Sequence, residues 1–275
     1  MTSLAALLTA GPALCLGIDP HAALLADWGL PDRADGLREF GLRAAEAARD
    51  AGAPVVKPQV ALFERHGSAG IAALEDVIAA ARAAGLLVIA DAKRGDIGST
   101  MAGYAAAWLA PGSPLEADAL TLSPYLGVGA LAPALEAAAA HGKTAFVLAA
   151  TSNPEGAALQ RAASPSGRTV AAEILDDVDA RNRLIGTGIG PLGVVVGATI
   201  DPAAFGLDLD AAASTPILAP GFGAQGARLA DAGRRFGAAT NRLVANVARE
   251  ALAAGPAGLE RRLRELDAEL AGAAA

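Results

Sequence analysis

The sequence predicts a parallel (β/α)8 barrel, the TIM-barrel architecture, on three observations. The chain has 275 residues, a common length for one such barrel. Eight short apolar runs recur along it, without the polar–apolar alternation of half-exposed strands. Segments of helical period separate these runs, and eight strand–helix repeats can close a parallel sheet into a barrel. The alternative is an open doubly wound sheet, but the Gly-x-Gly-x-x-Gly turn that usually follows its first strand is absent.

The predicted strands are brief and rich in Ala, Val, Leu and Ile, as expected of strands buried on both faces. They are Ala13–Ile18, Pro54–Val56, Leu86–Ala90, Ala117–Leu122, Thr144–Ala149, Leu192–Gly197, Ile217–Ala219 and Ala238–Thr240. The helices predicted between them are Arg38–Ala51, Ile71–Ala84, Gly129–Ala140, Thr169–Ile185 and Arg228–Phe236. A longer loop, Thr151–Gly167, follows the fifth strand, where barrels often carry a lid. We expect one domain over residues 1–275, ending in a charged helical tail with a solvated face at about 257–275.

Composition limits the kinds of partner. The net charge of −7 argues against a nucleic-acid groove, which needs a basic surface. Cys15 is the only cysteine, so an intramolecular disulfide is excluded, and we expect a reducing, cytoplasmic compartment. The apolar first residues lack the basic region and cleavage site of a signal peptide. No uninterrupted apolar stretch is long enough to span a membrane.

Lysine is scarce in this chain. Of its 22 Lys and Arg residues, only three are lysines: Lys57, Lys93 and Lys143. A lysine ammonium can release a proton near neutral pH in a suitable environment, whereas an arginine cannot. Lys57 and Lys93 follow predicted strands, which favours a chemical role. We interpret Lys143 as a chance occurrence.

The ends of the predicted strands carry the candidate site, because barrel active sites lie at the C-terminal ends of strands. In the segment Asp91–Asp96, strand alternation puts Asp91 and Lys93 on one side, and Asp96 can return toward them after the turn. Lys57 would join them from the neighbouring strand. The set alternates two carboxylates with two ammonium groups. A structural salt-bridge network is the alternative interpretation.

These segments resemble a known family. Asp91-Ala92-Lys93-Arg94-Gly95-Asp96-Ile97-Gly98-Ser99-Thr100 resembles the D-x-K-x-x-D-I-x-x-T signature of orotidine 5′-monophosphate decarboxylases. Val56-Lys57-Pro58-Gln59 is similar to the strand-two segment of the longer bacterial branch, type 2. Further segments resemble that family in the expected order: Gly17–Pro20, Thr151–Asn153, Pro220–Gly226 and Asn241-Arg242.

The resemblance implies decarboxylation of orotidine 5′-monophosphate to uridine 5′-monophosphate and CO2, the last step of de novo pyrimidine biosynthesis, without cofactor or metal. In that family the second lysine, here Lys93, protonates C6 of the pyrimidine. Asp91 would lie against the departing carboxylate, and Lys57 would hold Asp91 charged. Asp96, with Ile97 and Thr100, would reach into the partner's site of a homodimer.

The resemblance also implies a set of substrate-binding residues: Asp19, Ser152, Gln225, Gly221, Gly223 and Arg242. Asp19 would bind ribose hydroxyls, Ser152 the pyrimidine edge, and Gln225 both phosphate and base. The glycines let the chain approach a phosphate closely, and Arg242 can bind it through two hydrogen bonds. A barrel-closing turn at the glycines and a plain turn role for Ser152 remain alternatives.

Three other functions compete with this interpretation. Metal-dependent barrel enzymes that act on hexulose or keto-gulonate phosphates share the D-x-K-x-x-D pattern. They carry an acidic metal ligand at the end of strand two, where this chain has Lys57, and an ammonium does not suit a Mg2+ site. A phosphate-ligand binding protein without activity is the second alternative. A barrel enzyme of unknown substrate is the third.

Overall fold

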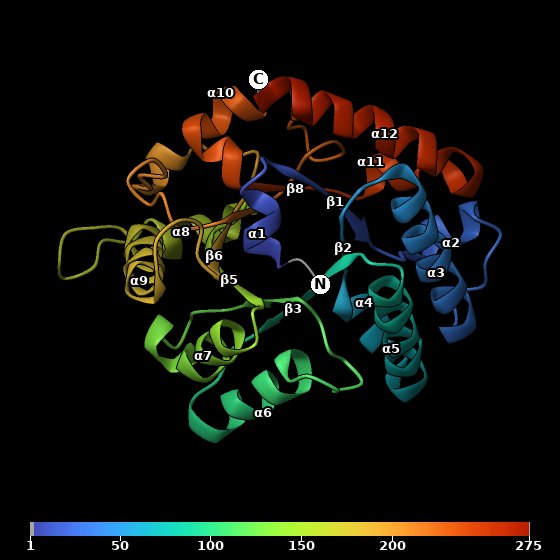
Figure 1. Cartoon of the computed structure of the whole chain (residues 1–275), viewed down its shortest axis with the longest axis horizontal. Helices are drawn as coiled ribbons and strands as arrows, with labels where there is room; N and C mark the ends of the chain where they lie inside the picture. The colour runs from blue at the N-terminus through green and yellow to red at the C-terminus, as the bar shows by residue number, and fades with distance from the viewer. Residues whose placement is uncertain (1–2, 275) are drawn as a thin grey trace.

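The computed structural model describes residues 3–274, which form a closed barrel of eight parallel strands in sequence order (Figure 1). Strand β8 pairs back onto β1, so the sheet has no free edge. The predicted (β/α)8 barrel is therefore confirmed. The strands are β1 (Ala13–Ile18), β2 (Val55–Pro58), β3 (Leu87–Arg94), β4 (Ala119–Leu122), β5 (Thr144–Ala150), β6 (Leu192–Val196), β7 (Ile217–Pro220) and β8 (Leu243–Val247).

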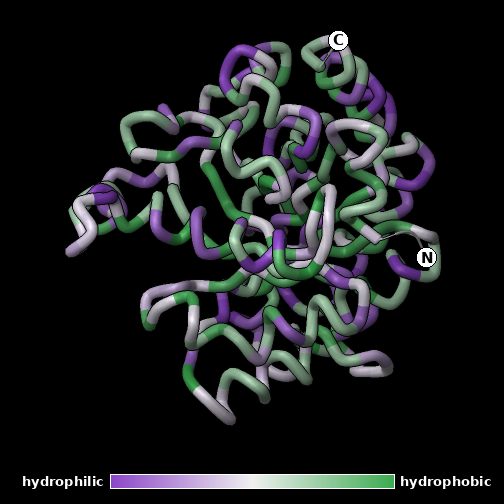
Figure 2. The backbone as a smooth tube through the Cα atoms, turned by 60° about the vertical axis from the view of Figure 1, so that its left-hand side comes forward, coloured by the Kyte–Doolittle hydropathy of each residue, from purple (hydrophilic) through white to green (hydrophobic). Residues whose placement is uncertain are grey.

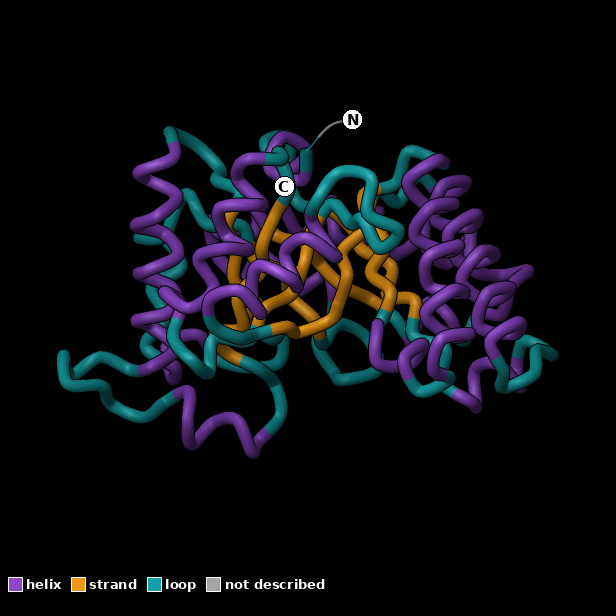
Figure 3. The backbone as a smooth tube through the Cα atoms, turned by 90° about the horizontal axis from the view of Figure 1, so that it is seen from below, coloured by secondary structure: helices purple, strands orange, loops and turns teal. Residues whose placement is uncertain are grey.

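Helices surround the strands, as the side view shows (Figure 3). The α-helices are α1 (Leu4–Leu8), α2 (Ala22–Asp27), α3 (Ala34–Ala51), α4 (Val60–Glu64), α5 (Gly67–Ala83), α6 (Gly98–Leu109), α7 (Ala132–Ala140), α8 (Ala157–Gln160), α9 (Val170–Ile185), α10 (Ala232–Phe236), α11 (Arg249–Leu252) and α12 (Gly255–Ala274). Five 3-10 helices join them: η1 (Val128–Leu131), η2 (Pro154–Gly156), η3 (Pro202–Phe205), η4 (Leu229–Asp231) and η5 (Gly237–Arg242). No helix within residues 3–274 is both long and apolar enough to cross a membrane.

The apolar residues form two packed layers. One fills the barrel interior, where α1 places Leu4 and Leu8 against side chains such as Cys15 and Phe146. Figure 1 shows α1 over the middle of the strand ring, so this helix plugs the N-terminal end of the barrel. The larger layer lies between strands and helices. Hydrophobic and hydrophilic segments alternate along the outer helices in Figure 2, consistent with one packed face on each.

The eighth strand differs from its prediction. Residues 238–240 belong to the 3-10 helix η5, and β8 is the following buried run, Leu243–Val247. The predicted strand Ala238–Thr240 is therefore wrong. Since Arg242 precedes β8, it lies at the N-terminal end of that strand, opposite the expected site.

The C-terminal tail is a helix, as predicted, but only part of it faces solvent. Leu259, Leu263, Leu266 and Leu270 recur every three or four residues and are buried. This face packs against α3 and η4. The charged residues occupy the remaining surface, in agreement with the expected solvated face, whereas the packed leucine face was not predicted.

Candidate active site

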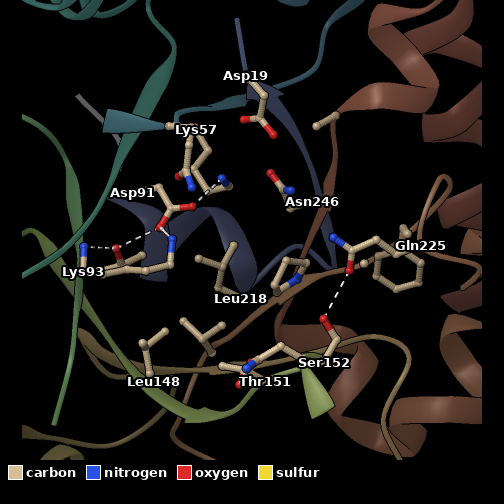
Figure 4. A pocket seen from close by; sticks show the side chains of 18 of the residues that line it. Asp19, Lys57, Asp91, Lys93, Leu148, Thr151, Ser152, Leu218, Gln225 and Asn246 are labelled. Atoms are coloured by element: carbon tan, nitrogen blue, oxygen red, sulfur yellow. Dashed lines mark hydrogen bonds and ion pairs between the residues drawn. The ribbon is translucent and has the colours of Figure 1, made fainter. Parts of the chain in front are cut away.

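A cavity of about 280 Å³ opens at the C-terminal ends of the strands (Figure 4). Strands on opposite sides of the barrel contribute to it, and the loop after β5 and the glycine-rich turn after β7 close one side. Seven of the predicted site residues line it: Asp19, Lys57, Asp91, Lys93, Ser152, Gly221 and Gln225. The fold thus gathers most of the predicted site around one space.

Asp91 lies between two lysines at the centre of the site. Its Oδ2 is 2.7 Å from Lys57 Nζ, and its Oδ1 is 2.5 Å from Lys93 Nζ. The Lys57 side chain is only 5% exposed and that of Asp91 11%, whereas that of Lys93 is 44% exposed. Lys57 is therefore an internal partner of Asp91, and Lys93 is the cation that a ligand can reach.

Burial and charge oppose each other in this pair. Burial by itself lowers the pKa of Lys57, but the Asp91 and Asp19 carboxylates outweigh it and raise that pKa above its ordinary value. Burial raises the pKa of Asp91, but Lys57 and then Lys93 outweigh it, so this pKa falls well below its ordinary value. Both groups consequently stay charged at neutral pH. Lys57 is a fixed ammonium rather than a base.

Two further side chains hold Asp91. Thr121 on β4 donates its hydroxyl to Oδ1 at 3.0 Å, and Gln59, with its amide nitrogen turned toward Asp91, donates to Oδ2 at 2.6 Å. The carboxylate thus accepts from four donors. Neither Thr121 nor Gln59 was predicted from the sequence. The available signal was a polar residue within or directly after an apolar strand.

Lys93 has an unusual backbone. Its φ of 48° makes it the only non-glycine residue with positive φ in the described chain, 3–274. Such a conformation costs about 1–3 kcal/mol and persists where surrounding contacts impose it. The β3–β4 register shifts between Ala90 and Arg94, so Lys93 lies in a bulge. Asp91 and Lys93 do meet, but plain strand alternation is not what brings them together.

Asp19 keeps an unused acceptor. Its Oδ1 is buried and has no hydrogen-bond partner among residues 3–274. Asp19 lies across the cavity from Lys93, near Asn246 from β8 (Figure 4). A buried carboxylate oxygen without a donor is costly, and a ligand hydroxyl would satisfy it.

The opposite side of the cavity is built by the β5 and β7 loops. Ser152 donates its hydroxyl to Gln225 Oε1 at 3.2 Å (Figure 4). Gly221, with φ of 116°, lines the cavity, but Gly223 does not. Gly223 instead donates its N–H to Ala227 O at 2.8 Å, and a Cβ on it would lie 2.0 Å from Glu250 Oε2. Glycine suits this position because its φ is 78° and the Glu250 side chain packs against the turn.

Arg242, which was predicted to bind the phosphate, lies away from the cavity. Arg242 is buried below the strands, and its guanidinium donates to the carbonyl oxygens of Thr215 and Leu209. Arg249 lines the cavity instead. It is exposed and has no side-chain hydrogen bond or ion pair to other residues of the described chain. The sequence signal was the largely apolar segment Leu243–Val247, interrupted by Asn246, which Arg249 follows by two residues.

Asp96, Ile97 and Thr100 lie outside the cavity of their own chain. Asp96 Oδ1 accepts the N–H of Ile97 at 2.8 Å, at the start of α6. Ile97 is 61% exposed, and Thr100 is exposed as well. The segment is thus separate from the Asp91 cluster within one chain.

Together, the Lys57–Asp91–Lys93 set, the Asp19 oxygen without a donor among residues 3–274 and the exposed Arg249 define a barrel-enzyme site for an anionic ligand that carries hydroxyl groups. The profile of the orotidine 5′-phosphate decarboxylase / HUMPS family matches residues 12–260, and the chain belongs to this family. The family predicted from the sequence is therefore confirmed.

Individual relatives agree with this assignment. A Salinispora arenicola protein named orotidine 5′-phosphate decarboxylase is 56% identical over 246 residues, which cover 90% of this chain and 86% of that protein. A Streptomyces coelicolor protein of the same name is 52% identical over 250 residues, with the same two coverages of 90% and 86%.

Solved structures are similar along the whole chain. A putative orotidine 5′-phosphate decarboxylase from Streptomyces avermitilis superposes with a TM-score of 0.93 at 49% identity, covering 100% of this chain and 97% of that one. Leishmania donovani UMP synthase superposes with a TM-score of 0.78 at 30% identity, covering 99% of this chain and 57% of that chain.

Proposed function

We propose that this chain decarboxylates orotidine 5′-monophosphate to uridine 5′-monophosphate and CO2, the last step of de novo pyrimidine biosynthesis. The observation that carries the proposal is the Lys57–Asp91–Lys93 set at the mouth of the barrel, in which Asp91 and Lys57 hold each other charged. Relatives at 52–56% identity that bear the name of this enzyme support it.

The decarboxylation requires electrostatic stabilisation of a carbanion rather than a cofactor that accepts its electrons. When the bond from C6 to the carboxylate breaks, the electron pair stays on C6 in the plane of the ring, where the π-system cannot accept it. A preorganised cation beside C6 can stabilise that pair. Lys93 takes this role, because its ammonium is accessible, and it then donates a proton to C6. No cofactor is needed for these steps.

Asp91 acts on the substrate carboxylate. Two anions about 4 Å apart repel by about 4 kcal/mol at an effective dielectric near 20, which favours loss of CO2. The repulsion requires Asp91 to stay ionised beside a second anion. The ion pair with Lys57 at 2.7 Å keeps it so, since it lowers the pKa of Asp91.

The remaining cavity residues bind the nucleotide. Asp19 Oδ1 accepts a ribose hydroxyl, and Ser152 with Gln225 contacts the pyrimidine edge and the phosphate. Gly221 lets the backbone approach the phosphate, and Arg249 replaces Arg242 as its cation. Arg249 suits this role because it faces the cavity without an ion pair to the described residues.

The enzyme acts as a homodimer in this proposal, with Asp96, Ile97 and Thr100 completing the site of the partner subunit. The exposed side chains that follow β3 and β4 support such an interface: Ile97 is 61% exposed, Tyr125 79% and Leu126 53%.

The test of the homodimer mixes two inactive variants, Lys93→Ala and Asp96→Ala. A mixed dimer holds one intact site and regains part of the activity. A verified mixed dimer without activity would rule out shared sites.

The activity test follows the ultraviolet absorbance of orotidine 5′-monophosphate with purified protein and EDTA. We expect a steady loss of the orotate band. The metal-dependent enzymes of keto-sugar phosphates are the competing class, and Lys57 disfavours them because its ammonium lies where their metal ligand would be. An unchanged spectrum with folded protein, followed by turnover of a keto-sugar phosphate with Mg2+, would replace the proposal by that class.

A further inference from the structure

One hydroxyl group joins the backbone of Lys93 to the side chain of Asp91. Thr121 Oγ1 accepts the N–H of Lys93 at 2.9 Å and lies 3.0 Å from Asp91 Oδ1. An ionised carboxylate can only accept, so the hydroxyl proton points to Asp91. Thr121 is 1% exposed, and its branched side chain has few rotamers, which fixes the direction of both contacts.

The bulge in β3 makes the first of these contacts necessary. The stretch from Ala90 to Arg94 faces only the stretch from Leu120 to Leu122 on β4. Strand pairing resumes where Arg94 O accepts the N–H of Ser123 at 2.8 Å. The N–H of Lys93 is thus left out of the ladder, and the Thr121 hydroxyl is its acceptor. The same contact holds Lys93 at its positive φ, which directs the side chain from Cα into the cavity.

We propose that Thr121 is a positioning residue, which sets the Lys93 ammonium and the Asp91 carboxylate at fixed places relative to each other; this rests on the proposed decarboxylation. The Lys93 side chain is long and 44% exposed, so apart from the ion pair with Asp91 the fold holds this residue through its backbone. Without the hydroxyl, Lys93 relaxes toward negative φ. Its ammonium then moves away from its place between Asp91 and the reacting carbon. Substrate contacts on the β1, β5, β7 and β8 side of the cavity stay in place.

The test compares Thr121→Val, which keeps the shape and removes the hydroxyl, with Thr121→Ser, which keeps the hydroxyl. Thr121→Val lowers kcat about 100-fold, the loss expected when a reacting group moves by about 1 Å. Its KM and its affinity for uridine 5′-monophosphate stay within about threefold, because the lost interaction acts in the transition state. Thr121→Ser keeps kcat within about threefold of the unmodified enzyme.

Thr215→Val is the matched control. Thr215 is fully buried and donates its hydroxyl to the Asp179 carboxylate at 2.9 Å, away from the cavity. This variant loses the same kind of hydrogen bond, and we expect a lower melting temperature with unchanged kcat. A Thr121→Val enzyme with normal kcat, or a Thr121→Ser enzyme as impaired as Thr121→Val, overturns the inference.

A second pair covers the case in which Thr121→Val does not fold. Thr121→Ala and Thr121→Ser both lose the methyl group, and only the alanine loses the hydroxyl. A much lower kcat in Thr121→Ala supports the positioning role, and equal kcat values overturn it. Failure of the unmodified enzyme to decarboxylate the nucleotide would overturn the proposed function itself, a result distinct from either variant outcome.

Discussion

The barrel carries an ion cluster at each end, and each pairs a lysine with a partly buried carboxylate. At the mouth, Asp91 lies between Lys57 and Lys93. At the N-terminal end, Glu116 accepts from Lys143 Nζ at 2.9 Å, from Arg82 Nη2 at 2.8 Å and from the N–H of Gly112 at 2.7 Å. Residue types alone do not distinguish the two clusters.

The two clusters differ in how much charge and hydrogen-bonding capacity they leave available to a ligand. Lys143 is 6% exposed and is held by Glu116, so its charge serves the packing of the barrel base. At the mouth, the side chain of Lys93 is 44% exposed and Asp19 Oδ1 lacks a donor among the described residues. A cluster whose charges satisfy one another is structural, whereas one with charge left over can bind a ligand. Lys143 thus has a structural partner in Glu116, which the interpretation as a chance occurrence did not anticipate.

Lys93→Ala gives the largest expected effect in this comparison. It removes the accessible cation, so we expect decarboxylation to fall by at least about 1,000-fold. The melting temperature should stay close to that of the unmodified protein, because the side chain is half in solvent. Absorbance assays and thermal unfolding measure the two quantities. Near-normal turnover would remove Lys93 from the mechanism.

Lys143→Met should show the reverse pattern. It removes one of the three donors of Glu116 and leaves Arg82 and the N–H of Gly112, so we expect the free energy of unfolding to fall by about 2 kcal/mol. The value of kcat should not change, because the base cluster lies at the far end of the strands. Urea unfolding and steady-state kinetics test both statements. A large loss of kcat in folded protein would contradict the division between the two ends.

Arg249→Ala and Arg242→Ala compare one cation from each end of β8. Loss of Arg249 removes a charged contact to phosphate worth about 2 kcal/mol, so KM should rise about 30-fold. Loss of Arg242 leaves the carbonyl oxygens of Thr215 and Leu209 without their donor, so stability falls while KM stays normal. The opposite assignment of the two effects would restore the original prediction for Arg242.

The pH dependence of stability gives the smallest expected effect. Burial raises the pKa of Glu116. Hydrogen bonds from the N–H of Gly112 and from the side chains of Lys143 and Arg82 outweigh burial and lower that pKa from 4.5 to about 2. Since the folded pKa is the lower one, this stabilisation is complete above pH 4.5 and is lost as the pH falls toward 2. The stability difference between the unmodified protein and Glu116→Gln should therefore shrink over that interval. A difference that stays constant on acidification would refute the assignment.

Most of the barrel could be predicted from the sequence, because strands buried on both faces leave unbroken apolar runs. The exception is Leu243–Val247, where Asn246 interrupts the apolar run and the Asn241-Arg242 resemblance drew the eighth strand upstream. The other four residues of this segment are apolar, which still favours it as a strand over Ala238–Thr240 and points to Arg249. The leucines of α12 likewise follow a helical spacing that predicts a packed face.

The site was predicted where motif residues carry charge, as with Lys57, Asp91 and Lys93. Thr121 and Gln59 were not predicted, because a neutral polar residue within or directly after an apolar strand is a weak signal beside charged motif residues. The bulge at Lys93 could not be foreseen, since it arises from the pairing of β3 with β4 rather than from local sequence. Long-range strand register is the information that the linear pattern lacks.

The scarcity of lysine also makes this protein unusually easy to label. All three lysines lie in the described part of the chain, and two of them, Lys57 and Lys143, are 4% and 6% exposed. An amine-selective reagent therefore has one accessible lysine side chain, Lys93, as its target. Reductive methylation with isotope-labelled formaldehyde would place one side-chain reporter in the cavity, alongside the label on the α-amine of the chain. The unmodified sequence thus supplies its own probe of ligand binding.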